Sequence, residues 1–247
     1  MRELSLFSGA GGGLLATVHL LGWTPVGYVE IDDYCQRVLA ARIADGLLPE
    51  APIFGDIRAF AAQWAERYRG MVDVVTAGFP CQPFSVAGKQ RAAGDSRNMW
   101  PETIRVIRQV RPRFAFLENV PGLLAGFHGY FGTALGDLAE SGFHVPWDCL
   151  GTADVGGNTR RTRLWLVAVA DEEYGKTWVG SQRDGQGWAA VLSGNYQTGL
   201  KRRIHAARRT ARGLNGVAHR VDRLRATGNG QVPTVAAAAW SLLMEER

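Results

Sequence analysis

Short apolar segments alternate with segments of helical periodicity along the first two-thirds of this chain, and no other feature constrains its fold as strongly. The segment Val72–Ala77 is an uninterrupted apolar run, typical of a strand that is buried on both faces. The other expected strands are Leu4–Phe7, Val26–Glu30, Ile53–Phe54, Phe114–Leu117 and Leu164–Ala170. Helical patterns lie between them, at Leu14–Leu21, Cys35–Arg42, Ala59–Tyr68, Ile104–Val110 and Phe131–Ser141. The alternation predicts an α/β fold with a mostly parallel sheet and helices on both faces, in which ligands bind at the carboxyl ends of the strands.

The texture of the sequence changes after Asp171. Residues 178–199 are rich in Gly, Ser, Gln and Asn with little periodicity, and a basic segment follows them. The segment Pro233–Glu246 then has the pattern of a terminal helix with a proline in its first turn. We therefore expect an α/β domain at residues 1–170, a small basic region at residues 171–225 and a C-terminal segment at residues 226–247.

The formal net charge of +5 is unevenly distributed. Residues 1–170 hold 16 basic and 16 acidic residues, whereas residues 171–247 hold 12 basic and 7 acidic residues. Nine of these basic residues lie between Lys201 and Arg225, where Asp222 is the only acidic residue. The excess indicates a polyanionic partner, although a solvated helix face would have the same composition.

Composition excludes several classes of protein. The 247 residues with 46% apolar content suffice for one sizeable core. No apolar run approaches the ~18 residues of a membrane helix, and the start lacks the pattern of a secretory signal, so we expect a cytoplasmic protein with no membrane partner. Three scattered cysteines, Cys35, Cys81 and Cys149, form neither a disulfide framework nor a metal-ligand pattern, so we expect no metal.

A glycine-rich loop, Phe7–Gly13, separates the first expected strand from the first helix. Glycines let the backbone turn sharply and approach a ligand closely. A dinucleotide fingerprint would need a glycine at Leu14, and none is present. Glu30 ends the second strand, where a carboxylate can bind ribose hydroxyls, and Asp56 ends the third, where it could contact an adenine ring. This set favours an adenosine ligand without a pyrophosphate; the alternative is a loop that is only a tight turn.

The loop after the most apolar strand carries a candidate nucleophile, Cys81, between two prolines. The prolines stiffen the loop and would present Cys81 at the carboxyl end of the strand. The thiolate is the reactive form, and an unperturbed thiol has a pKa of about 8.5. Glu118 ends the next strand, so we expect it beside Cys81, where a carboxyl group can donate a proton to a ring nitrogen. The alternative is a buried structural cysteine with a capping glutamate.

These motifs, in this order, resemble those of the cytosine-C5 DNA methyltransferase family over nearly the whole chain. The last motif is the one that returns the C-terminal helix to the cofactor domain in that family. In chain order the matching segments are Phe7–Gly12, Glu30, Asp56, Pro80–Gln82, Glu118–Val120, Arg161–Arg163 and Gly228–Pro233.

The resemblance implies a Rossmann-like, S-adenosylmethionine-dependent methyltransferase sheet with a small target recognition region. Residues 1–170 would bind the cofactor and catalyse, residues 171–225 would recognise the target, and residues 226–247 would return to the catalytic domain. Cys81 would add to C6 of cytosine while Glu118 protonates N3, after which C5 attacks the sulfonium methyl group of S-adenosylmethionine. Arg161 and Arg163 would hold the O2 side of the ring or the adjacent backbone, and the target base would be flipped out of duplex DNA.

The resemblance also assigns residues to the cofactor and to the nucleic acid. The segment Ser85–Asn98 resembles the family's mobile loop that closes over the flipped base, with an ordinary solvated loop as the alternative. The cofactor residues would be Phe7, Gly9, Gly11, Gly12, Glu30, Ile31, Asp56, Ile57, Pro80, Trp100 and Asn229. The residues in contact with the substrate would be Gln82, Ser85, Lys89, Arg97, Asn119, Val120, Arg202, Arg203, Arg208 and Arg209.

Two features depart from the family pattern. Thr159 replaces the glutamine of a Gln-x-Arg-x-Arg motif and so removes a side-chain amide that helps to order the active site in that family. The region between Arg163 and Asn229 has only about 65 residues, so we expect it to read few base pairs or to depend on phosphate contacts.

The favoured hypothesis is a monomeric DNA methyltransferase of a prokaryotic or phage-infected cell, acting on duplex DNA. A related enzyme that methylates a tRNA cytosine is the nearest alternative, because both substrates are polyanions. A non-catalytic DNA-binding paralogue is another, although such proteins usually lose one of Cys81, Glu118 and Arg163, which are all present here. The small recognition region also leaves open an accessory recognition subunit.

Overall fold

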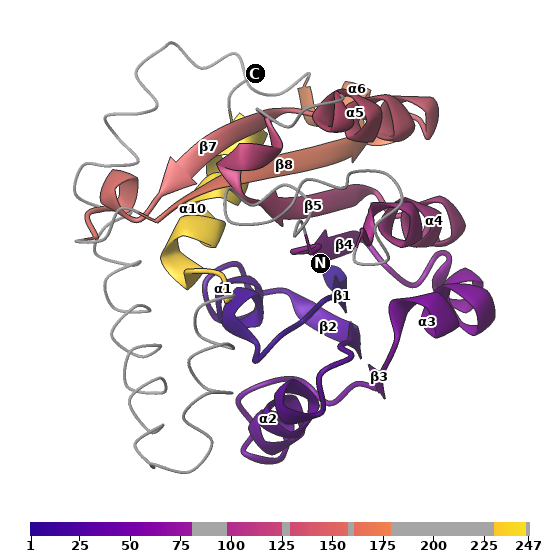
Figure 1. Cartoon of the computed structure of the whole chain (residues 1–247), viewed down its shortest axis with the longest axis vertical. Coiled ribbons are helices and arrows are strands. Elements are labelled where there is room, and N and C mark those ends of the chain that lie inside the picture. The colour runs from indigo at the N-terminus through magenta and orange to yellow at the C-terminus, as the bar shows by residue number, and fades with distance from the viewer. Residues whose placement is uncertain (81–97, 125–128, 158–160, 179–229, 246–247) are drawn as a thin grey trace.

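The chain folds around one mixed β-sheet with helices on both faces (Figure 1). The structure is a computed structural model and describes residues 1–80, 98–124, 129–157, 161–178 and 230–245. The strand order is β3-β2-β1-β4-β5-β8-β6, and β7 also pairs with β8. The strands are β1 (Arg2–Leu6), β2 (Thr24–Val29), β3 (Ile53–Phe54), β4 (Val74–Ala77), β5 (Phe114–Asn119), β6 (Phe143–His144), β7 (Trp147–Gly151) and β8 (Thr162–Ala170). The α-helices are α1 (Gly12–His19), α2 (Asp33–Ala44), α3 (Ile57–Gln63), α4 (Trp100–Val110), α5 (Tyr130–Glu140), α6 (Asp171–Trp178) and α10 (Pro233–Glu245).

The first five strands are parallel, as the alternation of strands and helices predicts. All six residues of β5 are buried, which fits the apolar composition of a strand covered on both faces. The pairing of Ala77 with Leu117 sets the register of β4 and β5 and brings Gly78 beside Glu118. The carboxyl ends of β1, β2, β4 and β5 therefore meet along one edge, where ligands bind in sheets of this kind.

The last strands depart from the parallel pattern. β8 is antiparallel to β5, and both β6 and β7 are antiparallel to β8. The sequence patterns predict neither β6, β7 nor α6, and they place the last strand in a mostly parallel sheet. A parallel pair needs a long crossover, whereas β7 and β8 are joined by a short connection that permits only antiparallel pairing.

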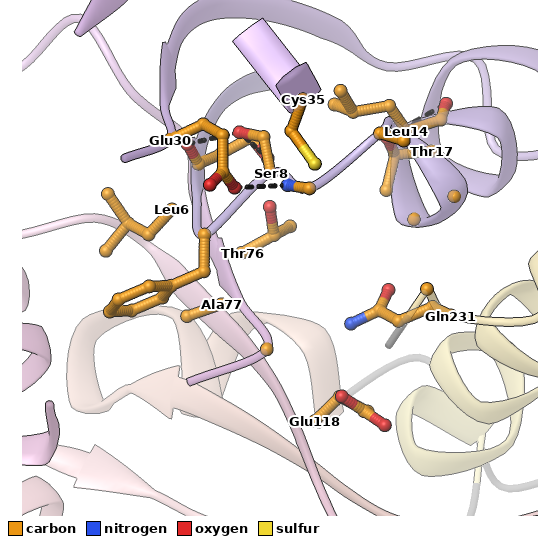
Figure 2. A pocket seen from close by; sticks show the side chains of 18 of the residues that line it. Leu6, Ser8, Leu14, Thr17, Glu30, Cys35, Thr76, Ala77, Glu118 and Gln231 are labelled. Atoms are coloured by element: carbon orange, nitrogen blue, oxygen red, sulfur yellow. Dashed lines mark hydrogen bonds between the residues drawn. The ribbon is translucent and has the colours of Figure 1, made fainter. Parts of the chain in front are cut away.

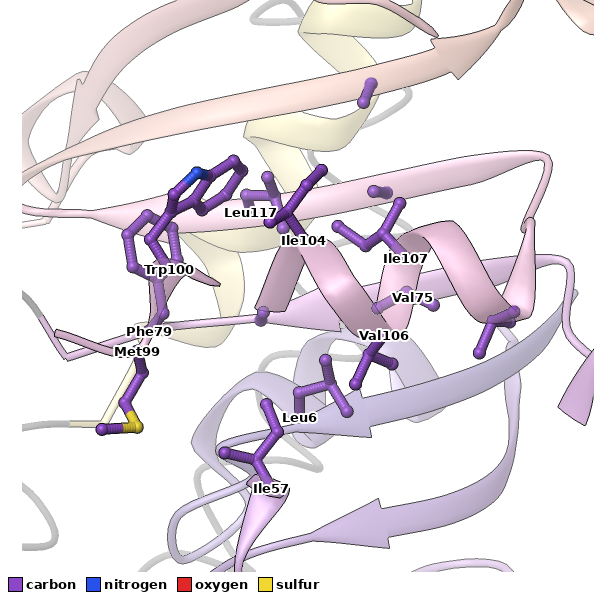
Figure 3. Packing of buried hydrophobic residues seen from close by; sticks show 14 of the residues in the cluster. Leu6, Ile57, Val75, Phe79, Met99, Trp100, Ile104, Val106, Ile107 and Leu117 are labelled. Atoms are coloured by element: carbon purple, nitrogen blue, oxygen red, sulfur yellow. The ribbon is translucent and has the colours of Figure 1, made fainter. Parts of the chain in front are cut away.

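The two faces of the sheet have separate apolar cores. α3, α4 and α5 cover one face, where Leu6, Ile107 and Leu117 belong to the same buried cluster (Figure 3). On the other face α1 and α10 pack side by side, and the ring of Trp240 lies 4.7 Å from that of Trp23. Complete burial of one leucine, isoleucine or phenylalanine side chain of these cores stabilises the fold by roughly 1.5–3 kcal/mol. Packing against α1 and the sheet therefore fixes α10, from the far end of the sequence, beside the first helix.

The described ranges contain no helix that is long and apolar enough to cross a membrane. The apolar helix α10 has 13 residues and packs its buried side chains against the sheet. Among the same residues no three His, Cys, Asp or Glu side chains come together as metal ligands would.

Candidate active site

The loop after β1 adopts backbone conformations that favour glycine. Gly9 and Gly11 have φ angles of 56° and 82°, and Phe7 is also left-handed at 52°. The Gly11 amide donates to the Ser8 carbonyl at 3.0 Å, which closes the turn before α1 begins at Gly12. Two glycines at positive φ therefore let the chain reverse without steric cost and leave main-chain groups facing the end of the sheet.

Glu30 holds this loop against the end of β2. Its carboxylate accepts hydrogen bonds from the backbone amides of Gly9, at 2.6 Å, and Asp32, at 2.8 Å. The Gln36 side chain donates to the Glu30 carbonyl at 2.6 Å and fixes the main chain there. A carboxylate has about four lone-pair sites, so Glu30 keeps capacity to accept hydrogen bonds from a ligand's hydroxyl groups.

The loop, Glu30 and the ends of β4 and β5 enclose a pocket of about 240 Å³ (Figure 2). Glu30 lies at one end and Glu118 at the other, with Thr76 and Ala77 of β4 between them. The side chain of Ile31 lines the pocket and is 65% exposed, so it presents an apolar surface to an incoming ligand. Of the predicted cofactor residues, those that line the pocket are Phe7, Gly9, Gly12, Glu30, Ile31 and Pro80.

Other predicted cofactor residues do not line the pocket, and their side chains have different roles. Asp56 caps the N-terminus of α3, and Ile57 is buried in the core beneath that helix. The ring of Trp100 lies 5.2 Å from that of Phe79, and its indole nitrogen donates to Asp137 at 2.8 Å. These side chains are engaged in capping and packing, and Gly11 forms the turn, so the structure does not bring these residues into the pocket.

A partly buried ion pair lies at the end of the pocket opposite Glu30. Arg163 Nε is 2.9 Å from Glu118 Oε1, and the two side chains are 23% and 11% exposed. Burial raises the pKa of the Glu118 carboxyl above its ordinary value, and the charges of Arg163 and Arg161 oppose that rise in part. Glu118 therefore keeps a proton at higher pH than a solvated glutamate does, which suits a proton donor.

Arg161 lies beside the same carboxylate and binds the C-terminal segment. Its Nη2 donates to the Gly230 carbonyl at 2.6 Å. Burial, and then the charge of Arg163, lowers the pKa of Arg161, while Glu118 raises it. An arginine guanidinium group keeps its proton even when its pKa is lowered in this way, so two cations face one carboxyl group.

The loop that carries the predicted nucleophile leaves β4 next to Glu118. An added Cβ on Gly78 would lie 3.1 Å from Glu118 Oε2, so only glycine fits there without displacing the carboxylate. Phe79 is buried, and its carbonyl accepts a hydrogen bond from the Asn119 side chain at 3.2 Å. Cys81 follows three positions after Gly78 and lies outside the described residues.

Two predicted substrate residues are described, and the others are not. Asn119 is buried at the end of β5, and its side-chain oxygen accepts a hydrogen bond from the Val120 amide at 2.8 Å. The segment Ser85–Asn98 is described only at Asn98, and of residues 171–225 only the first eight, which form α6, are described. The predicted site residues outside the described ranges are Cys81, Gln82, Ser85, Lys89, Arg97, Arg202, Arg203, Arg208, Arg209 and Asn229.

Gln231 lines the pocket near Glu118 and is not among the predicted site residues. Its position within the segment Gly228–Pro233, directly before the predicted last helix, was the available signal. Hydroxyl-bearing residues that line the pocket are also not among the predicted site residues. These residues are Ser5, Ser8, Thr17 and Thr76. Ser5 alternates with two leucines on β1 and so lies on the opposite face of the strand, and this alternation was the available signal for Ser5.

The fold and the pocket define a class of protein. A sheet with helices on both faces and a glycine loop at the end of β1 is the architecture of S-adenosylmethionine-dependent methyltransferases. Dnmt2 methyltransferase from S. pombe superposes with a TM-score of 0.54 at 19% identity, over 76% of this chain and 57% of that one. A mutant of DNMT2 from Spodoptera frugiperda gives 0.52 at 23% identity, over 75% and 53% of the two chains. At these identities the likeness shows the fold alone.

The sequence comparison then identifies the family. The model of the C-5 cytosine-specific DNA methylase family matches residues 1–195, so the chain belongs to that family, as its motifs predict. It is 35% identical to the Type II methyltransferase M.NgoMIV of Neisseria gonorrhoeae over 69% of this chain and 52% of the relative. It is 32% identical to the Type II methyltransferase M.AquIA of Picosynechococcus over 72% of this chain and 74% of the relative. The chain spans about half the length of several curated relatives that it matches.

Proposed function

We propose that this chain transfers a methyl group from S-adenosylmethionine to C5 of cytosine within a short specific sequence of duplex DNA. One observation carries the proposal: a buried carboxyl group, Glu118, lies at the end of a ligand pocket, beside the point where the Cys81 loop leaves the sheet. Family membership and the Type II methyltransferase relatives support DNA as the substrate.

The residues of the pocket fit S-adenosylmethionine. The free lone pairs of Glu30 suit the hydroxyls of a ribose, and the exposed side chain of Ile31 offers an apolar surface to an adenine ring. The main chain of the Phe7–Gly13 loop is open to the methionine portion, because its glycines leave the backbone uncovered. When bound, the cofactor supplies a methyl group activated as a sulfonium.

Within this proposal the chain's own residues activate the cytosine. The Cys81 sulfur forms a bond to C6, and Glu118 gives its proton to N3, so that electron density is transferred to C5. After Glu118 has given up its proton, Arg163 neutralises the resulting carboxylate. Arg163 also holds that carboxylate beside the position that N3 must occupy. Once C5 carries the methyl group, a water molecule takes the C5 proton. The electron pair left behind forms the C5–C6 double bond and expels Cys81 as a thiolate, and N3 returns its proton to Glu118.

A cytosine stacked in a duplex cannot reach this buried carboxyl group. Flipping the base out costs a few kcal/mol, which contacts to the phosphates can offset. We propose that basic residues after Asp171 make these contacts, with Arg202, Arg203, Arg208 and Arg209 as the first candidates. This basic region is short. A separate subunit that recognises the target sequence is therefore an alternative source of these contacts within the same proposal.

Transfer of labelled methyl groups from S-adenosylmethionine to duplex DNA, and separately to tRNA, tests the proposal. Wild type and Cys81→Ser are compared, and bisulfite sequencing locates the product. Label at cytosines of one short DNA motif, lost in the variant, is the expected result. Label in tRNA alone would assign the chain to RNA methylation, and no label in either substrate with cofactor still bound would overturn autonomous catalysis.

A further inference from the structure

Gln231 enters the pocket from the far end of the sequence. It lies two residues before Pro233, where α10 begins, and its side chain lies between α1 and Glu118 (Figure 2). The backbone on its N-terminal side is fixed, because Arg161 donates to the Gly230 carbonyl at 2.6 Å. On its C-terminal side the Ala236 amide donates to the Val232 carbonyl at 3.0 Å, in the first turn of α10.

Three glycines leave the space that Gln231 occupies. An added Cβ on Gly12 would lie 2.9 Å from the Gln231 carbonyl oxygen, and one on Gly13 would collide with its side-chain Oε1. An added Cβ on Gly78 would lie 3.3 Å from Gln231 Nε2 and 3.1 Å from Glu118 Oε2. The side-chain amide therefore extends from the start of α1 to the end of β4, where its nitrogen and the Glu118 carboxylate lie near the same point on Gly78.

Two side chains from separate parts of the chain lie near the Glu118 carboxyl group. Arg163 Nε, from β8, faces Oε1, and the Gln231 amide lies close enough to lower the pKa of the carboxyl group. The charged groups that face Glu118 among the described residues are Arg161, directly before β8, and Arg163, within it. Gln231 offers a neutral donor, and a hydrogen bond from it would fix the plane of the carboxyl group without adding a third cation.

We propose that Gln231 is a positioning residue that holds the Glu118 carboxyl group in its reactive orientation and links it to the cofactor loop at Gly12 and Gly13. This inference rests on the proposed function, since it concerns the orientation of the proton donor. Without the amide, Glu118 is held on one side only and can rotate away from the base. A carboxyl group misplaced by about 1 Å can lose on the order of a hundredfold in rate.

Gln231→Met tests this inference, because methionine keeps the length of the side chain and removes the donor. Gln63→Met, at the exposed end of α3, is the matched control. We expect Gln231→Met to lower kcat roughly ten- to a hundredfold, with the KM for S-adenosylmethionine changed less than about threefold. Loss of a hydrogen bond to the carboxylate should also raise the pKa of Glu118. Unchanged kcat, or a loss confined to the KM for the cofactor, would overturn the inference.

A second measurement separates this inference from the proposed function. The pKa of Glu118 is followed by NMR of carboxyl-labelled glutamates, and Glu118→Gln identifies the signal. An upward shift of the pKa in Gln231→Met and not in Gln63→Met supports the contact, even for a protein that transfers no methyl group to DNA. An unchanged pKa in Gln231→Met would overturn the inference whether or not the wild type is active.

Discussion

Arg163 Nε lies 2.9 Å from Glu118 Oε1, and this contact depends on the antiparallel register of two strands that are far apart in the sequence. Glu118 pairs with Trp165, so Arg163 lies two residues before the partner position on β8. Because Arg163 stabilises the ionised form of a carboxyl group whose pKa is raised by burial, it limits how far that pKa rises. Two opposing effects therefore set the pKa of Glu118 at this contact: burial raises it and the charge of Arg163 lowers it.

Replacing Arg163 by alanine should lower kcat for methyl transfer by roughly a hundred- to a thousandfold, since one donor to a developing charge is lost. The pKa of Glu118 should rise further, because burial acts without its nearest cation. A carboxyl group that must donate a proton is active below its pKa, so activity falls as pH rises through that pKa. The alkaline limb of the kcat profile should thus move to higher pH in Arg163→Ala. Arg105→Ala, at a surface pair on α4, is the control and should leave the profile unchanged; an unmoved limb in Arg163→Ala would contradict the assignment of Glu118.

Glu30→Ala should weaken S-adenosylmethionine binding by roughly ten- to a hundredfold, as measured by isothermal titration calorimetry. The Gly9 and Asp32 amides lose their acceptor, and hydrogen bonds to a charged group are each worth about 1.5–3 kcal/mol. The exposed Glu66, on the turn after α3, provides the control variant Glu66→Ala. Equal affinity in Glu30→Ala and wild type would mean that the cofactor does not use this end of the pocket.

Gly12→Ala should destabilise the protein by about 1–3 kcal/mol, because the added Cβ lies 2.9 Å from a main-chain oxygen of Gln231. The segment before α10 would have to move, so cofactor affinity should fall as well. Gly136→Ala in α5 is the opposite case, with no atom within 4 Å of the added Cβ. It should stabilise the protein by roughly 0.5–1 kcal/mol, the usual gain for alanine over glycine within a helix. Urea unfolding measures both effects, and equal stability of the two variants would refute the close approach.

Glu3→Gln should change how stability depends on pH. Burial raises the pKa of Glu3 to about 7 from its ordinary value of 4.5, although its Oε1 accepts a hydrogen bond from Thr76 at 2.6 Å. A pKa raised on folding gives a stabilising contribution that is complete below the unfolded pKa and is lost as pH rises through the folded one. The wild type should therefore lose on the order of 3 kcal/mol relative to Glu3→Gln between about pH 5 and pH 8. The free energy of unfolding of both proteins at the two pH values checks this, and parallel changes would show that Glu3 has an ordinary pKa when folded.

Elements with a strong local signal were predictable, and elements defined by pairing were not. Ile53–Phe54, the apolar strand of Val74–Ala77 and the helix from Pro233 agree closely with the expectation. β6 was missed because Phe143–His144 has one apolar residue and no apolar run, and β7 was missed because Trp147–Gly151 becomes a strand only through its pairing with β8. In the site, Glu30 and Pro80 line the pocket, whereas Trp100 packs against Phe79 and donates to Asp137; their roles toward a cofactor stay predictions.

The sequence by itself determined the alternation of strands and helices from β1 to α5, the family, and the residue types that carry the proposed chemistry, because periodicity and short motifs are local properties. It also identified Glu118 as the carboxyl group at the end of β5. Only the tertiary structure decided that β8 is antiparallel and brings Arg163 to Glu118, and that α10 packs beside α1 and carries Gln231 into the pocket. Those contacts join segments separated by dozens of residues, and their geometry follows from packing on two faces of one sheet, which no local pattern encodes.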